Sequence, residues 1–256
     1  MDLREVNAQP LLRRHPWELV RARYFISVLE KHHLLARDGA ILDAGSGDGW
    51  FAQCLAKRLS DARTIICWDH EYTPAQLQAF QEESSLRGPT YTRDAPTERC
   101  SLILLLDVLE HIQHDMGFLK ELIANNLDAD GLILISVPAW AYVFGPHDVF
   151  LGHYRRYAPK QLQALVKAAN LEIIDRGELF HFPLIVRILQ AVAARMAPTR
   201  TQPPSTELHW QHGRWITWMA YAMLRIDSLM SIGLSRMGIR IPGLSTWVLC
   251  RLERHS

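Results

Sequence analysis

The chain has 256 residues, of which 48% are hydrophobic and 21% are charged. A chain of this length can bury enough apolar surface to fold without disulfides or a structural metal, and this composition excludes a fibre, a coiled coil and a disordered protein. The 28 Lys and Arg residues nearly balance the 27 Asp and Glu residues, which leaves a net charge of +1. No overall field therefore draws the protein to nucleic acid or to acidic lipid.

The cysteines and the N-terminal residues indicate the cellular compartment of the protein. The four cysteines lie in apolar segments and include no C-x-x-C pair, so we interpret them as buried thiols. Residues 1–14 are polar and lack the apolar core of a secretory signal, and no apolar run approaches the about 20 residues that span a membrane. We therefore expect a cytoplasmic protein.

Strand-like and helix-like segments alternate over most of the chain. Continuous apolar runs such as 101–106 and 132–137 are typical of strands buried on both faces, and segments with helical spacing of apolar residues separate them. In chain order the sequence predicts helices over 17–35, 50–59, 74–84, 115–127 and 159–170, and strands over 40–42, 64–68, 91–93, 101–106, 132–137, 171–175 and 245–252. Such alternation forms parallel βαβ units, so we expect a three-layer α/β sandwich with helices on both faces of the sheet.

Residues 183–242 break this alternation. They contain two apolar stretches at helical spacing, 184–196 and 215–237, joined by a Pro-rich linker. The segment holds seven Arg residues but only two acidic residues, so it is locally basic. We expect one α/β domain formed by residues 1–182 and 243–256, with 183–242 as a helical insertion or lid before the last strand.

The most informative motif is a glycine-rich loop at the end of the first predicted strand. Asp43, Gly45, Gly47 and Gly49 alternate with other residues directly before the second predicted helix. Glycines let the backbone approach a ligand closely, and the N–H groups of the following helix favour negative or polar ligand groups. The G-x-G-x-G spacing differs from the G-x-G-x-x-G of dinucleotide folds, and no G-K-[ST] follows, so the loop indicates neither NAD(P) nor a P-loop nucleotide.

Three further aspartates follow predicted strands. Asp69 ends the second strand about 20 residues after the loop, where a carboxylate can accept both hydroxyls of a ribose. Asp94 follows the third strand, where a carboxylate can accept an adenine amino group, and Asp107 follows the fourth. Because ligands of open α/β sheets bind beyond the carboxyl ends of the strands, we expect these three carboxylates and Asp43 to gather around one ligand.

Several stretches of the chain resemble the class I S-adenosylmethionine-dependent methyltransferases. Residues 41–52, ILDAGSGDGWFA, look like motif I of this class. Residues 102–115, LILLLDVLEHIQHD, and residues 131–159 are similar to the fourth- and fifth-strand segments of the branch that includes the ubiquinone-biosynthesis O-methyltransferases, and GLSTWVL resembles the last antiparallel strand. The resemblance covers about residues 35–180. It implies a Rossmann-like sheet of seven mostly parallel strands with the last one antiparallel, and S-adenosylmethionine as cofactor with S-adenosylhomocysteine as product.

The resemblance also implies which residues hold the cofactor. The glycine loop would cradle the methionine end, the carboxylate after the second strand would hold the ribose hydroxyls, and its neighbour and the residues after the third strand would border the adenine. In chain order the implied contacts are Asp43, Gly45, Ser46, Gly47, Asp69, His70, Asp94, Ala95 and Asp107. The sequence departs from the family before the fourth strand, where many relatives carry an aspartate and this chain has Cys100 and Ser101.

Methyl transfer to a hydroxyl group needs an oriented acceptor and a base for its proton. Histidine suits this role because its pKa lies near neutrality. His111 follows the fourth predicted strand and His147 and His153 follow the fifth, and together with Asp107 they are our candidate catalytic residues. A structural or cofactor-shell role for His111 stays open. We expect no metal, because these segments contain neither an i, i+4 histidine pair on a helix nor a cysteine partner.

The segment after the fifth strand also supplies candidate substrate contacts. These are Tyr142, Arg156 and Tyr157, although a solvated turn is the alternative for the last two. The 183–242 segment either packs against the rest of the molecule, covers an apolar acceptor as a lid, or rests on a membrane surface. Within it, one cluster of aromatic and sulfur-containing side chains consists of Trp210, Trp215, Trp218, Met219, Tyr221 and Met223.

We therefore expect a methyltransferase that methylates an oxygen atom of a small, apolar or aromatic acceptor. Lipid-linked molecules are included among these acceptors. The alternatives are methylation of a small metabolite at nitrogen or carbon, and a module that binds the cofactor without turnover. Nucleic acid is not an expected partner, because the neutral chain lacks an N-P-P-Y-type block after the fourth strand. Peripheral contact between the basic, apolar helices and a membrane stays open.

Overall fold

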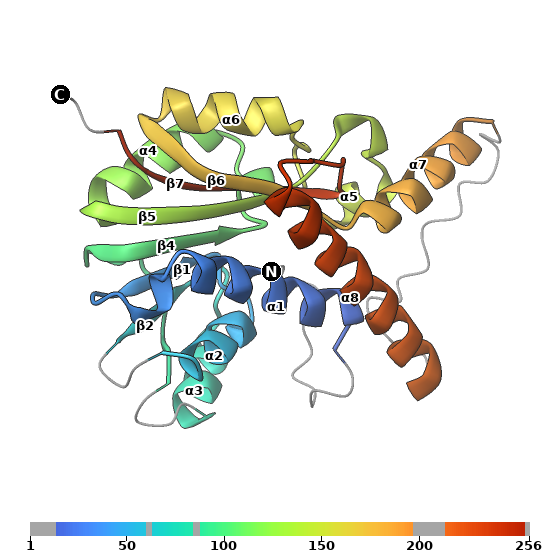
Figure 1. The fold of residues 1–256 in the computed structure, drawn as a ribbon. Helices are drawn as coiled ribbons and strands as arrows, with labels where there is room; N and C mark the ends of the chain where they lie inside the picture. The colour runs from blue at the N-terminus through green and yellow to red at the C-terminus, as the bar shows by residue number, and fades with distance from the viewer. Residues whose placement is uncertain (1–13, 60–62, 84–87, 197–212, 254–256) are drawn as a thin grey trace.

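A single seven-stranded sheet forms the centre of the computed structural model, which describes residues 14–59, 63–83, 88–196 and 213–253 (Figure 1). The strands are β1 (Ile41–Ala44), β2 (Ile65–Trp68), β3 (Thr90–Thr92), β4 (Cys100–Leu106), β5 (Leu127–Pro138), β6 (Leu171–Leu179) and β7 (Ser245–Leu252). Their order across the sheet is β3-β2-β1-β4-β5-β7-β6. The pairings among β1 to β5 are parallel, whereas β7 runs antiparallel to both β5 and β6. The expected sheet with an antiparallel last strand is confirmed.

Helices cover both faces of this sheet, as the alternating sequence pattern predicts. The helices of the described residues are α1 (Pro16–Lys31), α2 (Trp50–Ala56), α3 (Pro74–Glu83), α4 (Asp115–Asn126), α5 (Pro146–Leu151), α6 (Pro159–Ala168), α7 (His181–Met196) and α8 (Arg214–Arg236). Short 3₁₀ turns span Leu34–Ala36, Leu109–His111 and Ala141–Val143.

The side chains of the central strand β4 point alternately into two cores, because successive residues of a strand face opposite sides of the sheet. Leu102 and Leu104 pack in the core that includes α1 and α2, and Ile103 and Leu105 pack in the core that includes α4 and α6. Each of these four side chains is fully buried, which contributes about 1.5–3 kcal/mol relative to exposure. The packing fixes the carboxyl ends of the strands, where the candidate site lies.

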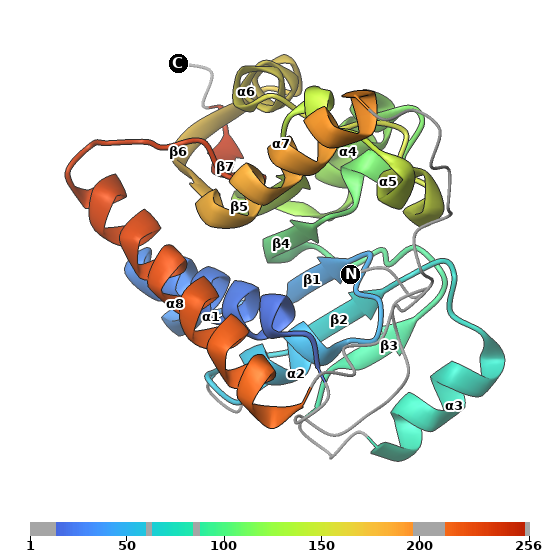
Figure 2. The same cartoon turned by 90° about the vertical axis from the view of Figure 1, so that its right-hand side faces the viewer.

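The two helices that the sequence predicts within 183–242 are confirmed as α7 and α8. Figure 2 shows α8 crossing beside α1, with which it is in contact. Asp227 of α8 caps α7, because its carboxylate accepts hydrogen bonds from the N–H groups of His181 at 3.1 Å and Phe182 at 2.9 Å. The predicted linker and Trp210 lie outside the described residues. None of the helices that the structure describes is long and apolar enough to cross a membrane.

The largest differences from the sequence prediction follow β4 and β5. His111 ends the 3₁₀ turn Leu109–His111, and α4 begins only at Asp115. The loop expected after β5 contains the 3₁₀ turn Ala141–Val143 and the helix α5. A helix as short as α5 cannot show a repeating apolar pattern in the sequence, so the pattern could not reveal it.

Candidate functional site

The glycine loop joins β1 to α2 in a backbone conformation that glycine adopts far more easily than other residues. Gly45, Gly47 and Gly49 have positive φ angles of 71°, 58° and 67°. At Gly45 a side chain would also collide with Val108, because a Cβ atom there would lie 2.5 Å from the valine Cγ2 atom. The loop can therefore present backbone N–H groups closely to a ligand.

The carboxylate at the end of β2 holds this loop. Asp69 is buried, and its Oδ2 atom accepts a hydrogen bond from the N–H of Gly47 at 3.0 Å while Oδ1 accepts one from the N–H of Glu71 at 3.0 Å. Beside them the hydroxyl oxygens of Ser46 and Tyr72 lie 2.8 Å apart in a hydrogen bond. The ends of β1 and β2 thus form one unit. Tyr72 was not among the predicted site residues, because no sequence motif marks it.

A pocket lies between this loop and α1, and its empty space, including the part open to solvent, is about 430 Å³. Its lining residues are Glu18, Arg21, Ala22, Phe25, Asp43, Gly45, Ser46, Asp48, Trp50, Phe51 and Leu106. Burial raises the pKa of Asp43 to about 6. The contribution of α1 was not predicted, because an amphipathic helix does not indicate in sequence which part of the sheet it will cover.

Arg21 of α1 connects this pocket to the end of β4. Its Nη1 atom lies 2.9 Å from Oδ2 of Asp107, and Ser136 donates a hydrogen bond to Oδ1 of the same carboxylate at 3.2 Å. Nε and Nη2 of Arg21 are buried and have no hydrogen-bond partner among the described residues. Asp107 itself has a positive φ of 59°. The arginine thus offers two N–H groups to a ligand in the pocket.

The predicted adenine contacts are solvent-exposed. The side chain of His70 is 78% exposed, and Asp94 and Ala95 also lie at the surface. Asp43, Asp69 and Asp107 lie at the ends of their strands as expected, and the first two are buried, whereas Asp94 is exposed.

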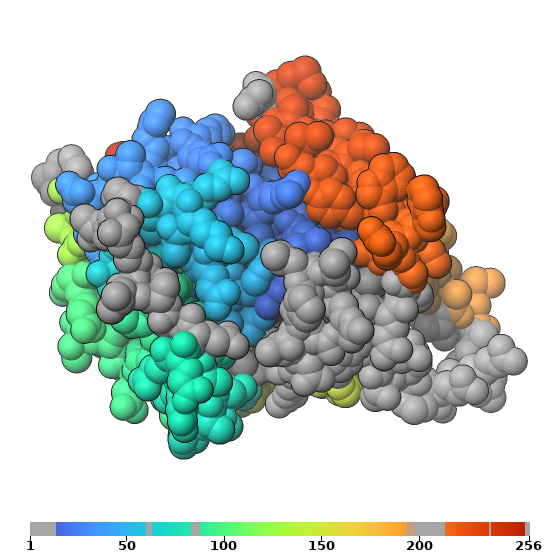
Figure 3. All heavy atoms as spheres, turned by 90° about the horizontal axis from the view of Figure 1, so that it is seen from below, coloured from blue at the N-terminus to red at the C-terminus, as the bar shows by residue number. Residues whose placement is uncertain are grey.

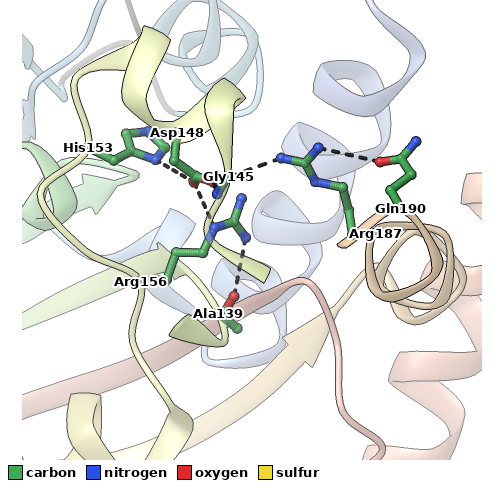
Figure 4. A network of polar contacts seen from close by, with 7 residues as sticks. All are labelled: Ala139, Gly145, Asp148, His153, Arg156, Arg187 and Gln190. Atoms are coloured by element: carbon green, nitrogen blue, oxygen red, sulfur yellow. Dashed lines mark hydrogen bonds and ion pairs between the residues drawn. The ribbon is translucent and has the colours of Figure 1, made fainter. Parts of the chain in front are cut away.

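The segment after β5 is held by a buried carboxylate, Asp148 of α5, shown in Figure 4. Its Oδ1 atom lies 2.9 Å from Nδ1 of His153 and accepts a hydrogen bond from Nε of Arg156 at 2.7 Å, and Oδ2 accepts one from the N–H of Gly145 at 2.9 Å. Arg187 of α7 approaches the same carboxylate at 3.8 Å. Burial alone would raise the pKa of Asp148, but the hydrogen bond from His153 and the charge of Arg156 lower it to about 2.

His153 meets His111 at the crevice. Their rings are arranged edge to face with centroids 4.6 Å apart, and the N–H of Tyr154 donates to the backbone oxygen of Glu110 at 2.8 Å. The Glu110 side chain is fully buried beside them, and its oxygens have no hydrogen-bond partner in the described part of the chain. Burial and the nearby charge of Asp107 raise the pKa of Glu110 well above its usual value. His147 lies at the surface of α5.

Of the three candidate substrate contacts, one is at the surface. Tyr142 is 47% exposed, whereas Arg156 and Tyr157 are buried. The hydroxyl of Tyr157 donates a hydrogen bond to Oδ2 of Asp115 at 2.7 Å, at the start of α4, and Nη1 of Arg156 donates one to the backbone oxygen of Ala139 at 3.2 Å. The alternative of a solvated turn is therefore wrong for Arg156 and Tyr157, because both side chains are buried and form hydrogen bonds inside the protein.

Comparison with known proteins supports a single family. Residues 17–176 match a family described as a methyltransferase domain, and none of the curated proteins matches the chain. A protein from Galdieria sulphuraria proposed to be a sarcosine dimethylglycine methyltransferase is similar in structure, with a TM-score of 0.56 at 16% identity over 92% of this chain and 85% of that chain.

Two further solved structures show the same fold. Coclaurine N-methyltransferase bound to N-methylheliamine and S-adenosylhomocysteine has a TM-score of 0.52 at 15% identity, over 88% of this chain and 72% of that chain. The [4+2]-cyclase SpnF has a TM-score of 0.51 at 14% identity, over 91% and 81%. The fold is therefore shared by proteins whose names describe different reactions.

Proposed function

Because the chain belongs to the family of methyltransferase domains, we propose that it transfers a methyl group to an oxygen atom of a small acceptor molecule. It is a class I enzyme of this kind, and its methyl donor is S-adenosylmethionine, which becomes S-adenosylhomocysteine. The observation that carries the proposal is the glycine loop between β1 and α2, which is held by Asp69 and borders the pocket beside α1.

The residues of this pocket fit the methionine end of the cofactor. Gly45 leaves a space that a Cβ atom would fill, and the partnerless N–H groups of Arg21 suit a carboxylate. Asp43 would take the methionine ammonium group, with Ser46 and Gly47 completing this end of the site.

The other end of the cofactor would lie beyond β2 and β3. Asp69 would accept the ribose hydroxyls with the lone pairs that its two backbone donors leave free. His70, Asp94 and Ala95 would border the adenine, and their exposure leaves them accessible to it.

The acceptor side is assigned to the residues after β4 and β5. Bound S-adenosylmethionine supplies a methyl group that is already activated by its positively charged sulfur. His153 would take the proton of the acceptor hydroxyl, as the carbon–sulfur bond breaks and the carbon–oxygen bond forms, and Asp148 would stabilise the charged ring. His111 and His147 are the alternative bases, and Asp107, held by Arg21, would border both ligands.

The three candidate substrate residues would then have two kinds of role. Tyr142 is accessible for direct contact with the acceptor. Arg156 and Tyr157 would act as positioning residues, because they fix the segment that carries His153 from inside the protein.

The apolar nature of the acceptor is proposed from α7 and α8. Figure 3 shows α8 as a ridge beside the N-terminal helix, and its Trp215 and Trp218 side chains are 80% and 64% exposed. We assign residues 183–242 to a lid over an apolar or aromatic acceptor, which also permits contact with a membrane that presents a lipid-linked acceptor. The 109–112 block, LEHI, favours the branch of the ubiquinone-biosynthesis O-methyltransferases.

The decisive experiment combines calorimetry with an assay of S-adenosylhomocysteine production. S-adenosylmethionine and S-adenosylhomocysteine should bind the full chain and NADH should not. A panel of phenols, amines and carbon acids should then give turnover with phenols, and replacing His153 or His147 by Ala should lower kcat by about 10²–10⁴ if that residue is the base.

Each other result has a defined meaning. Turnover with amines or carbon acids alone would replace oxygen by nitrogen or carbon as the methylated atom. Binding without turnover of any acceptor would indicate a cofactor-binding module, and NADH binding in place of S-adenosylhomocysteine would overturn the proposal.

A further inference from the structure

Three potential metal ligands meet where the segment after β4 faces the segment after β5. Glu110 and His111 come from the 3₁₀ turn Leu109–His111, and His153 comes from the segment that follows α5. One carboxylate oxygen and one ring nitrogen from each histidine all lie within 4.8 Å of one another. The sequence predicted a site without metal, because these segments contain neither an i, i+4 histidine pair on a helix nor a cysteine partner.

The burial of the Glu110 carboxyl group is the strongest indication that the cluster binds a cation. Its side chain is fully buried, and neither of its oxygens has a hydrogen-bond partner among the described residues. A carboxyl group buried in this way stays ionised only where a cation compensates for its charge. Arg21, whose charge acts on Glu110, forms its ion pair with Asp107 at 2.9 Å instead.

His153 is oriented as a metal-binding histidine usually is. Its Nδ1 atom lies 2.9 Å from Oδ1 of Asp148, which leaves Nε2 as the ring atom available to a ligand. Metal-binding histidines almost always donate their other ring N–H to such a partner, which fixes the tautomer and the ring orientation. Asp148 is itself fixed by Arg156 and by the N–H of Gly145 (Figure 4).

The ligand types decide the kind of ion. Two imidazoles and one carboxylate suit a first-row divalent transition metal, whereas magnesium and calcium prefer oxygen ligands only. Bonds of about 2.0–2.2 Å place the ligand atoms around such an ion about 3–4 Å apart, so small side-chain rotations would close the cluster.

We propose that Glu110, His111 and His153 bind one divalent transition-metal ion at the acceptor side of the crevice. Three protein ligands leave coordination positions open, and a hydroxyl that binds there loses its proton more readily. With the ion bound, His153 is its ligand and not the base that accepts the acceptor proton. This last role rests on the proposed function, whereas metal binding does not.

The test is a titration of tag-free, metal-depleted full-length protein with Co²⁺, followed by its visible absorption. One Co²⁺ should bind per chain and give visible d–d bands, and Zn²⁺ should displace it. Glu110→Gln and His153→Ala should each lower the affinity about tenfold or more. The matched control is His114→Ala, an exposed histidine outside the cluster, which should bind Co²⁺ like the wild type.

Thermal melting separates metal binding from a folding defect. Co²⁺ should raise the Tm of the wild type and of His114→Ala but not that of Glu110→Gln, which should remain folded because Gln removes the buried charge. Absence of the visible bands, or equal Co²⁺ affinity in the wild type and both cluster variants, would overturn the proposal. Binding of S-adenosylhomocysteine by the metal-free protein, measured alongside, tests the proposed function separately.

Discussion

Asp43 is a buried carboxyl group in the cofactor pocket, and its protonation should control binding. Burial raises its pKa to about 6, so the group becomes protonated as the pH falls below that value. Only the carboxylate can pair with the methionine ammonium group of the cofactor. Affinity should therefore fall with decreasing pH.

The expected effect on S-adenosylhomocysteine is a loss of up to about tenfold in affinity per pH unit below 6. Calorimetry between about pH 5 and about pH 7.5 would measure it. Asp43→Asn is the control, because it should bind weakly and without this pH dependence. An identical pH profile in the variant would assign the effect to another group.

Gly45 is the position where the loop tolerates a side chain least. Gly45→Val combines a positive φ of 71° with a collision against Val108, so it should abolish measurable binding of S-adenosylhomocysteine. Gly117→Val is the matched control, because a Cβ atom at this helical glycine meets nothing within 4 Å. Equal affinity in the two variants would show that the ligand does not approach the loop.

Among the elements, the segment around α5 depends on Asp148. Asp148→Asn should lower the free energy of unfolding by about 3 kcal/mol or more, because it leaves the buried Arg156 without its counter-charge. Urea denaturation measures this value. Glu172→Gln is the control, since its pair with Arg251 is exposed to solvent and should contribute little to stability.

The pH dependence of this effect has a defined sign. The pKa of Asp148 is about 2 in the folded protein, below the ordinary aspartate value of about 4. The stabilisation by its charge is therefore complete above about pH 4 and is lost as the pH falls towards 2. The difference between the wild type and Asp148→Asn should therefore shrink over that range. A constant difference would mean that the charge of Asp148 is not its cause.

Helix α8 carries the prediction about membranes. Insertion of Trp215 and Trp218 would contribute about 1.5–3 kcal/mol each, and Arg225 would add attraction to anionic lipid. Wild type should float with anionic liposomes at low salt, and a variant with all three residues changed to Gln should not. Ile174→Gln, at an exposed position on β6, is the control. If the wild type does not float at any salt concentration, membrane contact is excluded and only the role of a lid is left for these helices.

At the scale of the whole molecule, cofactor binding should stabilise the fold through α1. Glu18, Arg21 and Phe25 of α1 line the pocket, and the same helix packs against α8 and the sheet. S-adenosylhomocysteine at 100 times its Kd should raise the free energy of unfolding by about 2.7 kcal/mol. Hydrogen exchange should slow in α1 as well as in the glycine loop. Protection confined to the loop would exclude α1 from the site.

The sequence by itself determined the order of strands and helices and the position of the glycine loop. These features depend on local patterns, namely continuous apolar strands, helical spacing and glycines at positions of positive φ. The carboxyl ends of β1, β2 and β4 follow from the same pattern, so Asp43, Asp69 and Asp107 could be placed at one edge. Asp94 could not, because its exposure depends on how the short strand β3 sits at the edge of the sheet.

Only the tertiary structure decided which side chains meet across separate segments. The pairing of Arg21 with Asp107, the burial of Glu110 beside His153 and the inward direction of Tyr157 each join parts of the chain with no common motif. Such contacts depend on helix packing and on the path of the segment after β5, which a one-dimensional pattern does not contain. A buried charge is stable only with a partner nearby in space, and spatial proximity is what folding adds to the sequence.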